Sequence, residues 1–280
     1  MTDDEREAAF RAARTRAVRR RTAILADSRA EIIRQLKLAQ ERIEAILAAQ
    51  PTDYQRWSLP QLQREISRVL ADMGEASAAQ LSAAAGKAWA AGQALIDAPL
   101  AAAGMGQIVE ALPEISTQQL FAMRAFMTDR IKDVAVQAVN RINTQLGLAM
   151  IGAQSPHEAM GAVQQILGEK SRERAFTIVR TELSRAYAVA NFERWRQTAG
   201  RLPGMQKEWR KSGKRHPRIH HAAMNGVRVA FGEPFTLHPP GRPPVKLMFP
   251  HDPAAPASET INCGCIMVPR LPPRATEGRQ

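Results

Sequence analysis

This chain contains few of the residues on which disulfide-rich and β-rich folds depend. Of its 280 residues only two are cysteines, and aromatic residues make up 5%. A disulfide scaffold needs more cysteines, and a β-sandwich is usually richer in aromatic and β-branched side chains. No segment approaches the ~18 consecutive apolar residues of a membrane-spanning helix. The first ten residues, MTDDEREAAF, are acidic and precede no apolar stretch, unlike a signal peptide. We therefore expect a soluble protein without a membrane partner, which stays in the cytoplasm where it is made.

Proline and glycine are absent from residues 3–50, so neither interrupts a helix in this segment. Apolar residues here recur at intervals of three and four, which makes one stripe along a helix. Similar stripes predict a second helix from about Ser58 and a third from Ser116. A short helix should run from Ser155 to near Gly168, and a fifth over 171–199. The three long stripes consist of Leu25, Ile32, Leu36, Ala39, Ile43 and Ile46; of Leu62, Ile66, Val69, Met73, Leu81, Ala84, Ala88 and Leu95; and of Leu120, Met123, Met127, Ile131, Val134, Ala138, Ile142 and Leu146.

Two of the expected helices start with a motif typical of helix N-termini. STQQ at Ser116 and SPHE at Ser155 predict capping boxes, in which Gln119 and Glu158 would bond back to the capping serine.

The sequence changes character after residue 200, where prolines, short β-type pieces and most of the histidines occur. We therefore expect a mainly α fold with three parts. A bundle of long helices should occupy residues 1–170. A small α+β or irregular C-terminal domain should follow over 171–270, and 271–280 should form a flexible tail.

Positive charge is concentrated in the last part of the chain. The formal net charge is +12, and residues 200–280 carry 13 Lys and Arg against 5 Asp and Glu. Such a surface attracts polyanions, nucleic acid among them, without reading a sequence. A soluble protein with a positive face is the plainer interpretation.

Three local motifs stand out from the composition. The first is VRTELSRAYAVAN (179–191) in the expected fifth helix, where Arg180 and Ser184 share a face. By spacing alone these are ordinary helix surface residues. The second is RHPRIHHAAMNG (215–226), in which His216, His220 and His221 precede an Asn-Gly turn. Such histidines are either metal ligands or turn residues on a basic surface.

The third motif is SETINCGCIMVPR (258–270), which holds both cysteines. A disulfide between Cys263 and Cys265 would close a strained ring, so we do not expect one. In an extended segment both thiols point the same way and can share a zinc ion. The remaining ligands would be one or two of the histidines at positions 216, 220, 221 and 251. Two free, partly buried thiols are the alternative.

Common catalytic motifs are missing. The chain has no GxxxxGK[ST] loop, no GxGxxG after a strand, no HExxH and no GxSxG. The histidine cluster leaves a metal-dependent nuclease as an alternative function. A plain DNA-binding protein is a third possibility, although aromatics for base stacking are scarce.

Taken in order, these motifs resemble one family. IVRTELSRAY, then Trp209, Arg218–His221–Met224–Asn225–Gly226, PPGRPP and a terminal NCGC follow each other as in the minor head proteins of Mu-like tailed phages, the Mu F or head-morphogenesis family. The resemblance covers about 171–270. Its signature positions are Arg180, Thr181, Glu182, Arg218, His221, Asn225, Gly226, Asn262, Cys263 and Cys265.

The resemblance implies a non-enzymatic virion protein. Such proteins are present in several copies in the inner head near the portal, and support head assembly and DNA packaging or ejection. The implied partners are the portal protein, the major capsid protein and packaged DNA, bound non-specifically, with the host cytoplasm as the place of assembly. The signature residues would hold the small C-terminal domain together, around zinc bound by His221, Cys263 and Cys265 if a metal is present.

The chain departs from the family pattern at two places. Gly264 stands where an arginine usually separates the cysteines, which should leave the thiol geometry intact. Lys214 and Arg215 stand where many members carry an acidic residue, which argues against an acidic catalytic or metal-binding role there.

Overall fold

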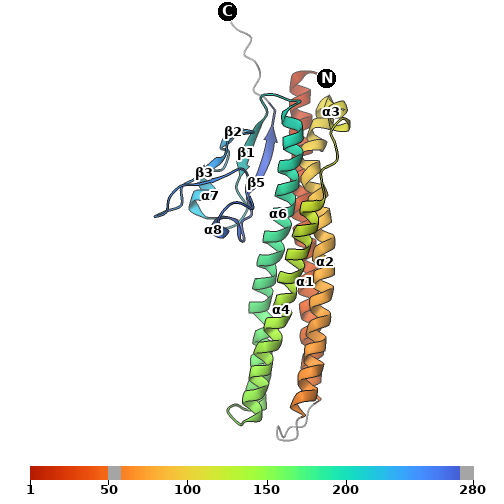
Figure 1. The fold of residues 1–280 in the computed structure, drawn as a ribbon, viewed down its shortest axis with the longest axis vertical. Coiled ribbons are helices and arrows are strands. Elements are labelled where there is room, and N and C mark those ends of the chain that lie inside the picture. The colour runs from red at the N-terminus through yellow and green to blue at the C-terminus, as the bar shows by residue number, and fades with distance from the viewer. Residues whose placement is uncertain (50–57, 272–280) are drawn as a thin grey trace, which may run out of the picture. The chain divides into compact units, whose positions relative to one another are not determined.

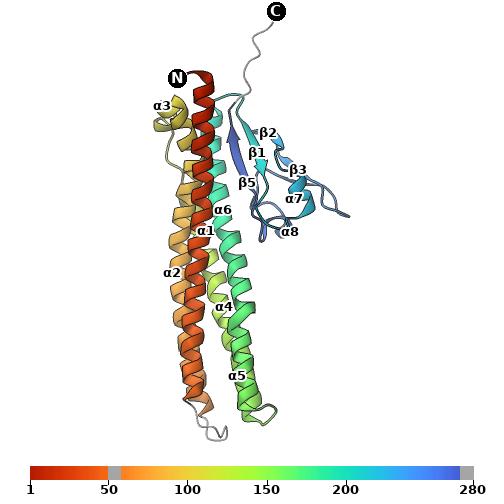
Figure 2. The same cartoon turned by 180° about the vertical axis from the view of Figure 1, so that it is seen from behind.

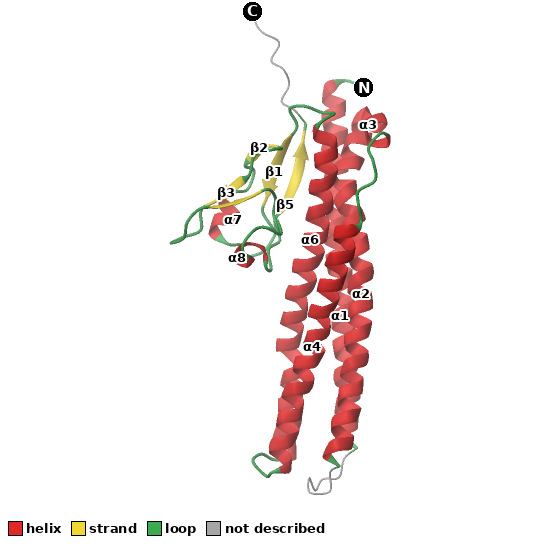
Figure 3. Ribbon diagram, viewed as in Figure 1, coloured by secondary structure: helices red, strands yellow, loops and turns green. Residues whose placement is uncertain are grey.

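The computed structural model of this protein describes residues 1–49 and 58–271. It is mainly α-helical, as predicted, and its strands all follow residue 205 (Figures 1 and 3). The α-helices are α1 (Asp3–Ala48), α2 (Leu59–Leu100), α3 (Gly106–Glu110), α4 (Gln118–Met150), α5 (Pro156–Gln165), α6 (Ser171–Ala199), α7 (Ile219–Ala223) and α8 (Ala257–Thr260). Short π-helical segments connect α2 to α3 (Ala101–Met105) and α5 to α6 (Ile166–Lys170). The strands are β1 (Gln206–Arg210), β2 (Arg228–Ala230), β3 (Phe235–Leu237), β4 (Val245–Leu247) and β5 (Ile266–Arg270). Among the described residues no helix is long and apolar enough to cross a bilayer.

Helix boundaries follow the local sequence signals closely. At Ser155 the predicted capping box is formed with Glu158, and α6 covers 171–199 as expected. The prediction at Ser116 is off by two residues. There α4 begins at Gln118, and the Ser116 hydroxyl accepts a hydrogen bond from the backbone N–H of Gln118 at 3.4 Å.

The chain forms two compact units. The first unit consists of Met1–Ile24, Ala85–Leu120 and the residues from Arg180 onward, and the second of Leu25–Ala84 and Phe121–Val179. The domain boundaries expected from the sequence stay a prediction. Of the predicted tail, all but Leu271 lies outside the described residues.

The second unit confirms most of the predicted helix stripes. In its segment of α1, Ile32, Leu36, Ala39 and Ile43 are buried. Two stripe positions are wrong by one residue, because Leu47 is buried where Ile46 was expected, and Leu70 where Val69 was expected. An α-helix turns every 3.6 residues, so a strict alternation of three and four drifts off the buried face. Leu25 and Met123 are also only partly buried.

In the first unit α2 and α6 approach each other closely. A Cβ placed on Gly92 of α2 would lie 2.3 Å from the carbonyl oxygen of Tyr187 in α6. Glycine is therefore required at this crossing. Nearby, Arg194 of α6 is buried and binds Asp97 of α2 at 2.7 Å.

A small antiparallel sheet belongs to the first unit, with strand order β2-β1-β5, and β3 pairs with β4 separately. Glu208 of the central strand accepts hydrogen bonds from Arg228 of β2 at 3.0 Å and from Arg270 of β5 at 2.6 Å. This carboxylate therefore ties all three strands together. Burial alone would raise its pKa, but the two guanidinium groups outweigh burial and lower it.

Strand β5 packs against helices of the same unit (Figures 1 and 2). The side-chain amide of Asn191 in α6 donates to the carbonyl oxygen of Met267 at 3.4 Å. Arg14 of α1 is buried and donates to the carbonyl oxygen of Pro269 at 3.0 Å. These contacts fix the strand that directly follows the two cysteines.

Lys207 of β1 is completely buried, on the same strand as the buried Trp209. Its ammonium lies 5.6, 6.0 and 5.3 Å from the ring centres of Phe192, Phe231 and Phe235. It also donates a hydrogen bond to the carbonyl oxygen of Met248 at 2.8 Å. Burial lowers the pKa of Lys207 to about 8, against the opposing influence of Asp252 and Glu233.

Candidate metal centre

Three potential metal ligands meet inside the first unit, although they are far apart in the sequence. His221 comes from α7, and Cys263 and Cys265 come from the segment between α8 and β5. The Nδ1 atom of His221 lies 3.6 Å from Sγ of Cys263 and 3.8 Å from Sγ of Cys265. All three side chains are buried, and neither cysteine forms a disulfide.

The ring of His221 is fixed from two sides. Its Nε2 atom lies 2.9 Å from the Glu259 carboxylate, and its plane is perpendicular to Trp209, with ring centres 5.5 Å apart. Because a carboxylate only accepts hydrogen bonds, Nε2 carries the proton in the neutral ring. The lone pair of Nδ1 then faces the two sulfur atoms.

The carboxylate of Glu259 in α8 accepts hydrogen bonds from several side chains around His221. His220 approaches the same carboxylate at 2.7 Å, and Arg242 binds its other oxygen at 2.9 Å. Burial alone would raise the pKa of Glu259, but hydrogen bonds from His220, His221 and Ser258 lower it to about 2. The carboxylate is therefore ionised at neutral pH and orients both imidazoles.

Residues from α6 hold the segment that carries the cysteines. The hydroxyl of Thr181 accepts a hydrogen bond from the backbone N–H of Asn262 at 2.9 Å. Arg180 donates to the side-chain oxygen of Asn262 at 3.2 Å, and Lys214 binds the same residue. Asn262 has a positive φ of 54°, which asparagine tolerates better than most residues. These bonds fix a sharp turn directly before Cys263.

The remaining signature residues support the neighbouring segments. Arg218 donates to the carbonyl oxygen of Ile261 at 2.9 Å. The side chain of Asn225 accepts from the backbone of Lys211 at 3.0 Å. Gly226, at a φ of +86°, donates to the carbonyl oxygen of Trp209 at 2.8 Å. Glu182 is buried and pairs with Arg185 at 2.7 Å within α6.

Hydrogen bonds within the cluster favour a thiolate at Cys263. The hydrogen bond with Cys265 lowers the pKa of Cys263; burial opposes this, while His221 and His251 add to it. The same hydrogen bond raises the pKa of Cys265, so the first proton leaves from Cys263. The backbone N–H of Cys265 donates to Sγ of Cys263 at 3.4 Å. Arg21 is buried and close enough for the thiolate charges to act on its own pKa.

Gly264 has a steric role that the sequence did not reveal. A Cβ at this position would lie 2.7 Å from Cβ of Ser212. The expectation that glycine leaves the thiol geometry intact stays a prediction. In this chain the close approach of Ser212 also depends on glycine.

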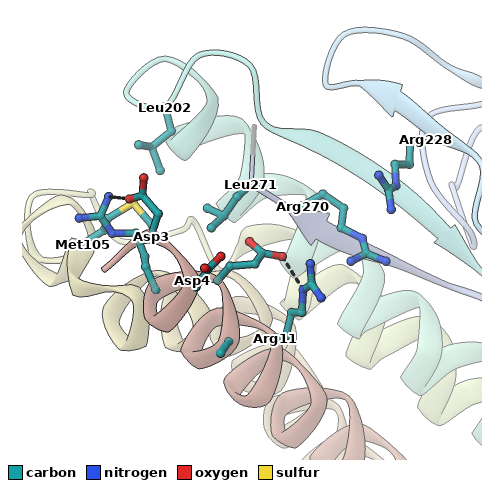
Figure 4. A pocket seen from close by; sticks show the side chains of 11 residues that line it. Asp3, Asp4, Arg11, Met105, Leu202, Arg228, Arg270 and Leu271 are labelled. Carbon is teal, nitrogen blue, oxygen red and sulfur yellow. Dashed lines mark hydrogen bonds and ion pairs between the residues drawn. The ribbon is translucent and has the colours of Figure 1, made fainter. Parts of the chain in front are cut away.

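A pocket of about 180 Å³ borders the cluster, and Lys214, His216, Arg218 and the two cysteines line it. His216 is exposed in its wall. A larger pocket of about 620 Å³ has none of these residues and is lined by Asp3, Arg11, Met105, Leu202 and Arg270, among others (Figure 4). Arg11 is paired with Glu7 and Arg270 with Glu208. This larger pocket therefore gives no indication of a charged ligand.

The structure brings together the predicted ligands His221, Cys263 and Cys265, whose donor atoms lie within 4.8 Å of one another. The three histidines of the RHPRIHHAAMNG motif do not all lie in one place. His220 forms a second group with His221 and Glu259, while His216 belongs neither to this group nor to the group with the cysteines. Glu259 was not predicted from the sequence. The signal was its position four residues before Cys263, but nothing in the sequence placed it beside α7.

The family described as "Phage Mu protein F like protein" matches residues 129–268, which is half of the chain and contains every signature position. The match begins within α4, earlier than the resemblance seen in the motifs. The "Uncharacterized protein YqbB" of Bacillus subtilis (strain 168) is 36% identical over 101 residues. These residues are 35% of this chain and 31% of that relative, so the similarity spans about a third of each. No solved structure matches the chain.

Proposed function

Because the chain belongs to the phage Mu protein F-like family, a family of phage head morphogenesis proteins, we propose that it is a minor capsid protein of a tailed phage. It resides in the inner head near the portal, in several copies per virion, and supports head assembly and DNA packaging or ejection. It reaches this place from the host cytoplasm. Its partners are the portal protein or the major capsid protein, and the packaged DNA.

The observation that carries the proposal is the family match over residues 129–268. The role of the signature residues agrees with a structural protein. Thr181 and Arg218 bond to the backbone of the segment around Asn262, and Gly226 bonds to the backbone of β1. Residues used in this way hold a fold together.

The chain would contact DNA through its positively charged side chains. The net charge of +12, with its excess after residue 200, favours contact with phosphates and specifies no base sequence. Non-specific contact of this kind suits a protein that meets packaged DNA of any sequence.

The alternative, a metal-dependent nuclease using the histidine cluster, has less support. Glu259 is only 2% exposed and is bound by Arg242 as well as by the two histidines. The adjoining pocket presents Lys214, His216 and Arg218, and no carboxylate is among its described lining residues. A hydrolytic metal site needs an open coordination position and a group that activates water.

A co-assembly experiment tests the proposal. The full chain is expressed with the portal and major capsid proteins of the phage or prophage that carries its gene, and proheads are separated on a gradient. We expect the chain to sediment with the proheads in amounts well below those of the major capsid protein. A chain that stays at the top of the gradient, with and without the portal protein, would contradict the proposal.

A second assay addresses the enzymatic alternative. Supercoiled plasmid is incubated with the purified protein and Mg²⁺, Mn²⁺ or Zn²⁺. We expect no cleavage. Metal-dependent cleavage that disappears in a folded His221→Asn variant would establish the nuclease instead.

A further inference from the structure

His251 is a buried histidine whose polar atoms are unexplained. It follows β4, is 1% exposed, and has a positive φ of 69°. Among residues 1–49 and 58–271, neither of its ring nitrogens has a hydrogen-bond partner. Buried polar groups without a partner are rare and costly, and a strained backbone at such a residue often accompanies function.

The His251 imidazole adds to the lowering of the pKa of Cys263, after Cys265 and His221, which puts it in the neighbourhood of that thiol. The turn that carries His251 is fixed by Asp252, which accepts hydrogen bonds from the backbone of Met248 and of Ala254, both at 2.9 Å. The fold thus holds a buried imidazole, without a hydrogen-bond partner among the described residues, in the neighbourhood of the cysteine cluster.

The spacing of the other three donors agrees with tetrahedral zinc. With Zn–S bonds of about 2.3 Å and Zn–N bonds of about 2.0 Å, the sulfur-to-nitrogen edge of a tetrahedron is about 3.5 Å. His221 Nδ1 lies 3.6 and 3.8 Å from the two sulfurs. Thiolate and imidazole are also the ligands that zinc prefers.

Glu259 supplies the outer contact that metal-binding histidines usually have. A histidine ligand commonly donates its other ring N–H to a carboxylate, which fixes the ring and raises its basicity. His221 makes this contact with Glu259 at 2.9 Å. Because Arg242 and Ser258 hold the other oxygen of Glu259, this carboxylate acts as an outer partner and not as a ligand.

We propose that His221 through Nδ1, Cys263, Cys265 and one ring nitrogen of His251 bind a single structural zinc ion. His251 lies outside the group whose donor atoms are within 4.8 Å of one another, so its ring turns toward the sulfur pair on binding. The ion thereby links α7, the turn after β4 and the segment before β5 to one another. This inference rests on the site alone and does not depend on a role in the phage head.

Zinc content is the first test. The full chain is produced in zinc-supplemented medium, and its zinc is measured by elemental analysis beside three variants. We expect about one zinc per chain in the wild type, a full complement in His216→Gln, and loss in His251→Gln and in Cys263→Ser/Cys265→Ser. His216→Gln is the matched control, because it removes a nearby histidine that is not a proposed ligand.

Cobalt spectroscopy keeps the proposal testable if the cysteine variant fails to fold. Metal-stripped wild type is titrated with Co²⁺, which reports thiolate ligation by charge-transfer absorption and tetrahedral geometry by intense visible bands. Both signals are expected in the wild type. Glu259→Gln should keep them with roughly 10- to 100-fold weaker metal binding, the usual effect of losing an outer partner, and His251→Gln should lose more.

Two results would overturn the proposal. A wild-type protein without zinc, whose stripped form gives no thiolate signal with Co²⁺, would mean two free buried thiols. A His251→Gln variant that binds metal as tightly as His216→Gln would mean a site of three protein ligands, with the fourth position open to the adjoining pocket.

Discussion

Replacing Lys207 with methionine should remove a pH-dependent contribution to stability. The ammonium of Lys207 is buried among three phenylalanine rings, and burial lowers its pKa from 10.5 to about 8. An unfolded chain therefore keeps the lysine proton between pH 8 and 10.5, while the folded protein releases it. Stability rises with pH wherever the unfolded state binds more protons. The cost of burying the charge is thus fully present below pH 8 and disappears as the pH approaches 10.5.

The size of this effect follows from the shift. At about 1.4 kcal/mol per pKa unit, Lys207 contributes a gain of roughly 2 to 3 kcal/mol in the free energy of unfolding between pH 7 and pH 10. The assay is urea unfolding at a series of pH values, comparing the wild type with Lys207→Met. The difference between the two proteins should change by this amount, because other groups titrate equally in both. A difference that stays constant from pH 7 to 10 would refute the reasoning.

Three further predictions concern close approaches and charge. Gly92→Ala should destabilise the protein by more than ~2 kcal/mol in thermal unfolding, because the new Cβ would meet a carbonyl of α6 at 2.3 Å, whereas Gly147→Ala, with open space around it, should be neutral or stabilising. Equal effects of the two variants would contradict this account of the α2–α6 crossing. Gly264→Ala should cost about 1 to 3 kcal/mol, and Ser212→Gly in the same chain should recover part of it. A double variant no more stable than Gly264→Ala would exclude a clash with Ser212. Binding of duplex DNA should weaken steeply with salt and should not depend on sequence, as measured by fluorescence anisotropy. An affinity that is independent of salt would argue against contact through charge.

The sequence was sufficient to predict α1, α2, α4, α5 and α6, because their signals are local, whereas the short helices α3, α7 and α8 were not predicted. Ile32, Leu36, Ala39 and Ile43 share a face by spacing alone and are buried together. The capping box at Ser155 depends on four consecutive residues, and it is formed. The predicted buried positions Ile46 and Val69 were wrong. Each has an apolar neighbour in the sequence, and helix packing buries that neighbour instead.

The candidate metal centre was only partly predictable, because its parts meet through the fold. The cysteine pair and the histidine motif were recognisable from their residue types. Which histidines face the thiols depends on how α7 and the turn after β4 are placed, and the sequence offered four candidates. Glu259 and the close approach of Gly264 to Ser212 arise from contacts between segments about 38 to 52 positions apart.

The most direct test of the proposed head role is the protein composition of purified virions. Particles of the phage or prophage that carries this gene would be purified through two successive gradients, and the chain quantified by mass spectrometry against the major capsid and portal proteins. We predict a few copies per particle, a number comparable to that of the portal subunits. Virions that are complete and infectious but contain none of this chain would contradict the account.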